Sequence, residues 1–162
     1  MKNLFKKVDL KNKNVLEIGC GTGTRTQQFS RIKGIQISAI DPDTQSIALA
    51  KKNNLEENID YTVGQAEKLN FKEKLFDIVI FTLSMHHINE GKRAISEACR
   101  VVKDRGTIVF IEPGAKGTIF EAEIMFDCFD GDETKQKDKA YKTIMQDKNI
   151  KMTSEFWGET EW

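Results

Sequence analysis

The sequence predicts one α/β domain with a doubly wound, mainly parallel sheet between two layers of helices. Short apolar segments alternate with segments of helical periodicity over residues 14–113, which is typical of right-handed βαβ units. A glycine-rich turn follows the first apolar segment. Polar residues suited to binding a ligand follow the ends of the other strands, at the edge where such sheets bind ligands. Together these observations predict a Rossmann-like, three-layer arrangement.

The expected elements follow in order along the chain. Strands are expected at about 14–18, 35–40, 60–63, 76–83 and 107–111. Helices are expected at 24–32, from a cap at 43 or 44 to about 53–54, and at about 90–103, with 104–106 as a turn. Gly34 ends the first helix, and Pro42 stops the second strand. Segment 76–83 is almost continuously apolar, which indicates a central strand buried on both faces.

Length and composition restrict the class of protein. The 162 residues predict a single domain spanning 1–162. The chain has 25 lysine and arginine residues and 25 aspartate and glutamate residues. It therefore lacks the overall positive charge that would predict nucleic-acid binding. No apolar run reaches the length of a membrane span. Cys20, Cys99 and Cys128 are widely spaced and odd in number, which predicts thiols in a reducing, cytoplasmic location and no metal site.

The glycine-rich turn is the most informative stretch. Gly19, Gly21 and Gly23 follow the strand at alternate positions, and a polar helical start follows them. Glycine lets a ligand approach the backbone, and a helix N-terminus offers N–H groups. Glu17 precedes the turn inside the strand. Its carboxylate would repel a pyrophosphate and suit an ammonium group, or else it accepts backbone N–H groups of the turn.

Residues 16–23 resemble the first motif of the class I S-adenosylmethionine-dependent methyltransferases. The resemblance covers about residues 15–113 and is strongest to the small-molecule, quinone-pathway-like (type 11) members. It implies the strand order 3-2-1-4-5 with a further antiparallel strand beside the fifth. It also implies that S-adenosyl-L-methionine gives its methyl group to a small-molecule acceptor by direct displacement, leaving S-adenosyl-L-homocysteine.

The resemblance also implies a set of cofactor-binding residues. Asp41 lies about twenty residues beyond the glycine turn, the offset expected of a ribose-binding acid; the alternative is a turn or cap aspartate. Pro42 would then lie against the adenine. Gln65 stands where the family often has an acid that accepts the adenine amino group, so that contact lacks charge assistance. The full expected set is Glu17, Gly19, Cys20, Gly21, Gly23, Asp41, Pro42, Gln65, Ala66, Glu67, Thr82 and His87.

No obligatory catalytic residue is expected, because an activated methyl donor mainly requires alignment with its acceptor. His86 and His87 follow the fourth strand and are the candidates for proton transfer. From the sequence we expect contact with a ligand rather than catalysis. Residues 82–85 lack the Asn- or Asp-Pro-Pro-aromatic run of adenine-specific amino methyltransferases, which disfavours that substrate class. Glu112 stands at the end of the fifth strand.

Residues 14–113 are therefore expected to form the cofactor-binding core, and 114–162 a helical substrate-side segment with residues 155–162 as a last strand. An uncovered edge of the fifth strand, or the C-terminal segment, would favour a homodimer. Two alternative functions remain open. One is a catalytically silent S-adenosylmethionine-binding domain or fragment. The other is a nicotinamide-dependent oxidoreductase, which Glu17 and the residue Thr24 in place of a third fingerprint glycine disfavour.

Overall fold

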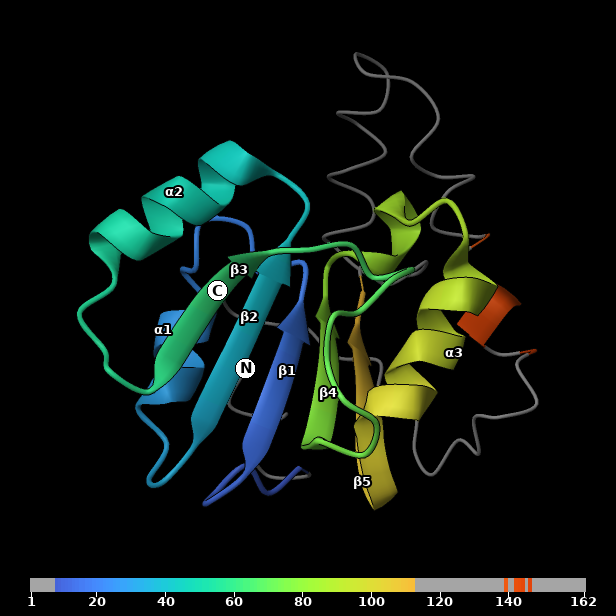
Figure 1. The fold of residues 1–162 in the computed structure, drawn as a ribbon, viewed down its shortest axis with the longest axis horizontal. Helices are drawn as coiled ribbons and strands as arrows, with labels where there is room; N and C mark the ends of the chain where they lie inside the picture. Colours follow the sequence, from blue (N-terminus) through green and yellow to red (C-terminus); the bar gives the residue numbers. More distant parts are fainter. Residues whose placement is uncertain (1–7, 113–138, 140–141, 145, 147–162) are drawn as a thin grey trace, which may run out of the picture.

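The computed structural model describes residues 8–112, 139, 142–144 and 146. The strands form a five-stranded sheet, and Figure 1 shows helices on both sides of it. The strands are β1 (Asn14–Ile18), β2 (Gln36–Asp41), β3 (Ile59–Val63), β4 (Phe76–Thr82) and β5 (Val102–Ile111). The helices are α1 (Thr26–Ser30), α2 (Thr44–Asn53), the single-turn η1 (Met85–His87) and α3 (Gly91–Val101).

The sheet has the order β3-β2-β1-β4-β5, and every neighbouring pair is parallel. This confirms the predicted doubly wound fold and the reversal of strand order between β1 and β4. All the carboxyl ends therefore lie along one edge, at the top of Figure 1. The glycine turn, the end of β2 and the loop after β4 meet at that edge, because β1 pairs with both β2 and β4.

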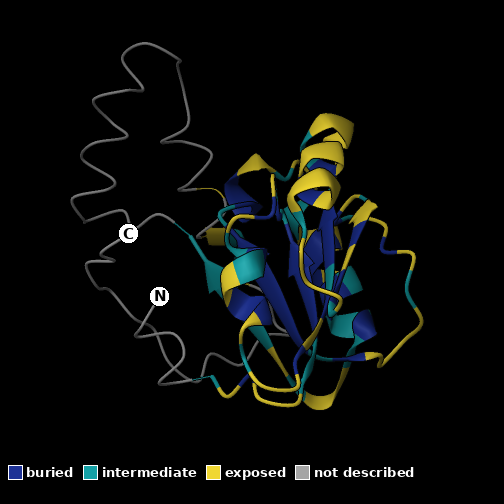
Figure 2. Cartoon of the chain, turned by 90° about the vertical axis from the view of Figure 1, so that its left-hand side faces the viewer, coloured by how far each residue is buried: buried dark blue, intermediate teal, exposed yellow. Residues whose placement is uncertain are grey.

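The two faces of the sheet bury different side chains, because alternate residues of a strand point to opposite faces. One core cluster joins Val15, Ile37 and Ile78 to Phe29 of α1 and Ile47 of α2. The other core cluster, formed by the alternate positions, packs against α3. Figure 2 shows the buried strands between the more exposed helices. The result is the three-layer arrangement that the sequence predicts.

Two elements differ from their predicted bounds. α1 has only five residues, where a helix over 24–32 was expected, so its few aligned peptide dipoles place little positive charge at its N-terminus. β5 begins at Val102, directly after α3, where a turn at 104–106 was expected. Val102 pairs with Phe76, and Thr107 pairs with Ile78, so the residues between them form a bulge. Arg105 has a φ of 66° there, which explains why the sequence resembles a turn.

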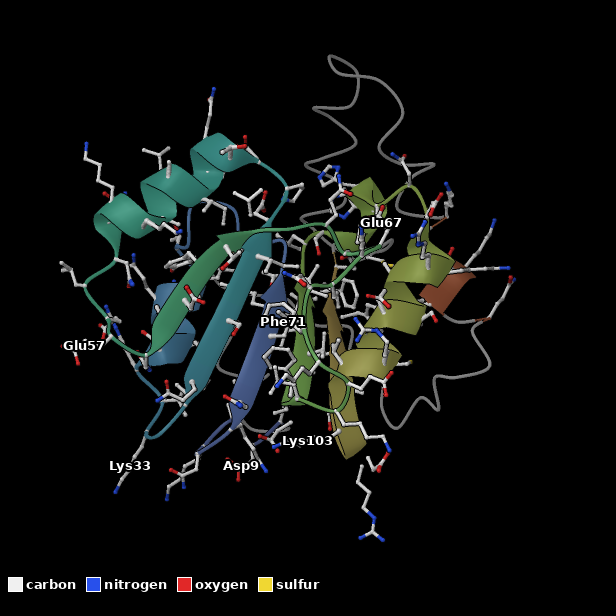
Figure 3. All side chains as sticks on the ribbon, viewed as in Figure 1. Asp9, Lys33, Glu57, Glu67, Phe71 and Lys103 are labelled. Atoms are coloured by element: carbon white, nitrogen blue, oxygen red, sulfur yellow. The ribbon has the colours of Figure 1, made fainter. Side chains whose placement is uncertain are left out.

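The segment between β3 and β4 crosses the same face of the sheet as α3, and Figure 3 labels Glu67 and Phe71 on it. Arg100 of α3 donates hydrogen bonds of 2.8 Å to the carbonyl oxygens of Leu69 and Phe71. Glu97 accepts a hydrogen bond of 2.8 Å from the Leu69 amide and pairs with Arg100. We call this group of contacts the Arg100 clamp. It fixes the segment that carries Glu67 to the last turns of α3.

The expected last strand at 155–162 lies outside the described residues, as does most of 114–162. Within the described ranges, β5 pairs only with β4. The same ranges contain no helix that is long and apolar enough to cross a membrane.

Candidate functional site

The glycine turn after β1 has the backbone conformation that glycine allows. Gly19, Gly21 and Gly23 have φ values of 80°, 53° and 82°, a backbone conformation that residues other than glycine rarely adopt. A Cβ atom on Gly19 would lie 2.2 Å from the Cβ atom of Ser84, and one on Gly23 would lie 2.4 Å from the Tyr61 hydroxyl oxygen. A Cβ atom on Gly21 would meet nothing within 4 Å. The outer two glycines therefore allow close packing, whereas the middle one borders open space.

Asp41, at the end of β2, joins the glycine turn to the turn that follows β2. Its Oδ2 atom accepts a hydrogen bond of 2.9 Å from the Gly21 amide, and its Oδ1 atom accepts one of 2.9 Å from the Asp43 amide. The amides of Gly19 and Cys20 donate to the Ile40 carbonyl oxygen. Asp41 therefore has the turn role given above as its alternative. Each carboxylate oxygen has a second lone pair, so both oxygens remain able to accept hydrogen bonds from a ligand.

Glu17 is fully buried, and neither of its carboxylate oxygens has a hydrogen-bond partner. The buried hydroxyl oxygens of Thr26 and Thr82 also lack partners. Burial raises the pKa of Glu17, and these two hydroxyls and the Arg25 charge act in the opposite direction without a well-formed hydrogen bond to the carboxylate. The expected alternative, that Glu17 accepts amides of the glycine turn, is therefore wrong. A buried polar group without a partner is costly and indicates a role beyond packing.

Two other groups beside the turn are perturbed by burial. The Cys20 thiol is buried, and burial followed by the charges of Glu17 and Asp41 raises its pKa. It is therefore a thiol rather than a reactive thiolate. Tyr61 of β3 is also buried, which raises its pKa to about 12, and its hydroxyl donates to the Gly23 carbonyl oxygen at 3.4 Å. Tyr61 thereby packs against the glycine turn at Gly23.

The remaining predicted cofactor residues lie around the same edge in different environments. Pro42 and Gln65 are exposed, and Glu67 is partly buried. Ala66 is buried in the cluster under α3. The Gly64 amide donates to the Asp41 carbonyl oxygen at 3.1 Å, which brings the 64–67 segment beside the end of β2. The structure therefore places the predicted residues of β1, β2 and the β3–β4 segment along one edge.

The loop after β4 is organised by Glu112, the residue after β5. Its Oε1 atom accepts hydrogen bonds from the amides of Ser84 (3.1 Å) and Met85 (2.8 Å). Its Oε2 atom lies 2.6 Å from Nδ1 of His86. The side chain of Glu112 is 17% exposed and that of His86 is 6% exposed, so solvent weakens the pair little. Leu83 has a φ of 48° at the start of this loop, a strained conformation for a branched residue.

A cavity of about 200 Å³ lies beside this loop. It is lined by residues of the 85–91 segment, including both histidines, and by Lys139 and Thr143. The rings of His86 and His87 are in contact, with their centroids 4.0 Å apart. In the described part of the chain, no group of three or more His, Cys, Asp or Glu residues could hold a metal ion.

Sequence reasoning placed Ser84 and Glu112 at the carboxyl edge of the sheet without a specific role, and it gave no role to Tyr61. The Ser84 hydroxyl donates to the Ile18 carbonyl oxygen at 2.9 Å, and its Cβ atom lies where a Gly19 side chain would be. Glu112 carries the signal that drew attention to Asp41, an acid at the end of a parallel strand. Tyr61 and Ser84 carry no such signal, because each is defined only by what it meets across the sheet.

Comparison with known proteins identifies the family of this chain. A family model described as a methyltransferase domain matches residues 16–110. Norajmaline N-methyltransferase of Rauvolfia serpentina is 30% identical over 67% of this chain and 39% of its own. Demethylmenaquinone methyltransferase of Renibacterium salmoninarum is 31% identical over 60% of this chain and 40% of its own. The chain thus spans about two fifths of the length of these curated relatives.

A solved structure of an S-adenosylmethionine-dependent methyltransferase from Aquifex aeolicus has the same fold. Its TM-score is 0.64 and its sequence identity is 20%, over 78% of this chain and 77% of its own. Since the family model covers more than half of the chain, and the fold agrees with that of the solved methyltransferase, the chain belongs to the methyltransferase-domain family, whose cofactor is S-adenosylmethionine.

Proposed function

We propose that this chain binds S-adenosylmethionine at the carboxyl edge of its sheet and transfers the methyl group to a small-molecule acceptor. The observation that carries the proposal is the glycine turn held by Asp41. Gly21 borders open space, and its amide is bound to a carboxylate that still has lone pairs to offer. Adenosine presents two ribose hydroxyls, and a carboxylate can accept a hydrogen bond from each.

The described residues fit this cofactor. Asp41 would hold the ribose hydroxyls, and Pro42, Gln65, Ala66 and Glu67 would surround the adenine. The unpartnered carboxylate of Glu17 would offset the charge of the ammonium group. Because Glu17 is fully buried, this effect is electrostatic and does not need surface contact. Cys20, Thr82 and His87 complete the proposed set.

The chemistry that S-adenosylmethionine supplies is an activated methyl group on a positively charged sulfur. The protein then has to orient the acceptor, bring it close and exclude water, which can supply roughly 7–11 kcal/mol of the barrier. Residues 14–113 would hold the cofactor, and 114–162 would form the substrate side. Lys139 and Thr143 support that division, since both line the cavity beside η1.

The small-molecule class is supported by the relatives, whose names give norajmaline and demethylmenaquinone. Balanced charge supports a partner other than nucleic acid, and the widely spaced cysteines support a cytoplasmic location. The second candidate function is a catalytically silent S-adenosylmethionine-binding domain.

Calorimetric titration with S-adenosylhomocysteine, and with NADH for comparison, tests the proposal. We expect binding of the former only. Gly21→Val should abolish it by placing a branched side chain over the turn, whereas Thr22→Val adds no bulk at an exposed neighbouring position and should bind like the parent. Binding without turnover across a broad panel of acceptors would favour the silent domain. Equal binding by the parent and Gly21→Val, with both folded, would contradict the site.

We also propose that the edge of β5 is covered by residues 155–162 or by a second copy of the chain. In the described ranges that edge has no partner strand, and such edges favour pairing. Light scattering with and without residues 154–162 tests this proposal. A monomer whose melting temperature is unchanged by the deletion would contradict it.

A further inference from the structure

The contact between His86 and Glu112 gives the loop after β4 a chemical property that the sequence alone does not predict. Glu112 accepts two backbone hydrogen bonds on Oε1 and contacts His86 on Oε2. A carboxylate oxygen only accepts, so Nδ1 of His86 carries the proton and donates it to this bond. In the neutral form of the ring, the lone pair is then on Nε2. Glu112 thus selects the tautomer in which His86 can act as a base.

The surroundings of His86 suit proton transfer from a bound molecule. The His86 side chain is otherwise buried, but it contributes to the lining of the cavity of about 200 Å³. A cavity of this order holds a molecule about the size of benzene. Lys139 lines the same cavity, and its ammonium group favours negative charge there. Among the residues that the structure describes, the titratable groups that face His86 or its cavity are Glu112, His87 and Lys139.

We propose that His86 is a general base for a phenol-like hydroxyl acceptor bound in this cavity, and that Glu112 is its positioning residue. This deepens the proposed function and rests on it. The O–H bond of the acceptor breaks, its proton moves to Nε2 of His86, and its electron pair stays on the oxygen. That oxygen is then the nucleophile for the methyl group. The imidazolium keeps its Nδ1–H bond to Glu112 and later returns the extra proton to solvent.

A Glu112→Gln variant separates a chemical role from a structural one. The glutamine carbonyl oxygen can still accept the amides of Ser84 and Met85, so the loop keeps its anchors. The amide nitrogen would donate to Nδ1 of His86 and force the proton onto Nε2. Glu90→Gln is the matched control, because Glu90 is an exposed acid beside the same loop that pairs with Arg93.

Nitrogen NMR of the imidazoles reads the tautomer without cofactor or acceptor. The chain has two histidines, and His87→Asn assigns their signals. We expect the Nδ1–H tautomer for His86 in the parent and in Glu90→Gln, and the Nε2–H tautomer in Glu112→Gln. An Nε2–H tautomer in the parent, or the same tautomer in a folded Glu112→Gln, would overturn the proposal.

The catalytic step is tested by measuring methyl transfer to two acceptors, phenol and 4-nitrophenol. The pH is chosen so that only 4-nitrophenol is ionised and needs no base. His86→Asn keeps a side-chain N–H for Glu112 but lacks the base. We expect it to lower turnover of phenol by about 10²–10⁴-fold, the usual range for a lost general base, and to affect 4-nitrophenol far less. Glu112→Gln should show the same contrast, with affinity for S-adenosylhomocysteine retained in both variants.

The outcomes distinguish this inference from the proposed function. Retained turnover of phenol in His86→Asn, or equal losses with both acceptors, would overturn the base role and leave the methyltransferase intact. Turnover of neither phenol in a chain that binds S-adenosylhomocysteine would overturn the hydroxyl class named here. Failure to bind S-adenosylhomocysteine would contradict the proposed function, and the tautomer measurement would still decide whether Glu112 orients His86.

Discussion

The Oδ2 atom of Asp41 accepts a hydrogen bond of 2.9 Å from the Gly21 amide, which joins the end of β2 to the middle of the glycine turn. Asp41 and Gly21 are twenty positions apart in sequence, and the parallel pairing of β1 with β2 brings them together. The bond sets the turn in place before any ligand arrives. Affinity at this edge should therefore depend on Asp41 both through contact and through the geometry of the turn.

Replacing Asp41 by alanine should weaken binding of S-adenosylhomocysteine by about 100-fold or more, since two charge-assisted hydrogen bonds contribute roughly 1.5–3 kcal/mol each. Asp43→Ala is the control. Asp43 caps α2 by accepting the amides of Gln45 and Ser46, so its loss should lower the melting temperature and leave affinity near the parent value. Calorimetry and thermal melts measure both quantities. Equal losses of affinity would mean that the turn was merely loosened.

The three glycines of the turn should respond differently to alanine. Gly19→Ala and Gly23→Ala combine a positive φ with a Cβ atom that would clash with the side chain of Ser84 or Tyr61. Each should therefore lower the free energy of unfolding by about 2–5 kcal/mol. Gly21→Ala has the φ penalty without the clash and should cost about 1–2 kcal/mol. Chemical denaturation of the ligand-free protein gives the three free energies of unfolding. A similar cost at all three positions would show that backbone strain alone sets the requirement.

Glu17→Gln should stabilise the ligand-free protein and weaken the cofactor site. Burial raises the pKa of Glu17 above its ordinary 4.5, so between that pH and the raised value the folded state binds more protons than the unfolded state. Stability from this group therefore falls as pH rises above 4.5. The neutral amide avoids that loss, so the variant should melt higher at neutral pH by about 2–4 °C for each kcal/mol gained.

The comparison has an internal control in pH. The advantage of Glu17→Gln in melting temperature should shrink as the pH is lowered toward 4.5, where the parent carboxyl is protonated in the folded state. Affinity for S-adenosylhomocysteine should fall in the same variant. A melting temperature below that of the parent at neutral pH would mean that Thr26 and Thr82 stabilise the carboxylate more than burial destabilises it.

The parts of the fold that the sequence predicts are those with a local signature. β4 is recognisable because its side chains are apolar on both faces. The glycine turn is recognisable because its backbone conformation requires glycine. The start of β5 was missed because a bulge near Arg105 has the same residue preferences as a turn. α1 is shorter than the sequence pattern predicts. Such a pattern shows which face of a helix is apolar but does not fix where the helix ends.

In the candidate site, too, some residues could be predicted from the sequence and others could not. Asp41 could be found because ligand-binding acids follow parallel strands at a known offset. The pairing of His86 with Glu112 spans 26 positions, and that of Tyr61 with Gly23 spans 38. Neither pairing follows from residue types, because each depends on which strands become neighbours and on how far a bulge shifts their register. The tautomer of His86 is therefore a property of the tertiary structure.

The Arg100 clamp has a consequence for how the cofactor site responds to stress. Its hydrogen bonds hold the segment that carries Gln65 and Glu67 to the last turns of α3. Loss of these bonds would release the proposed adenine side while the glycine turn and Asp41 stay in place. Substitutions on α3, remote from any ligand atom, can thus tune base recognition separately from ribose recognition.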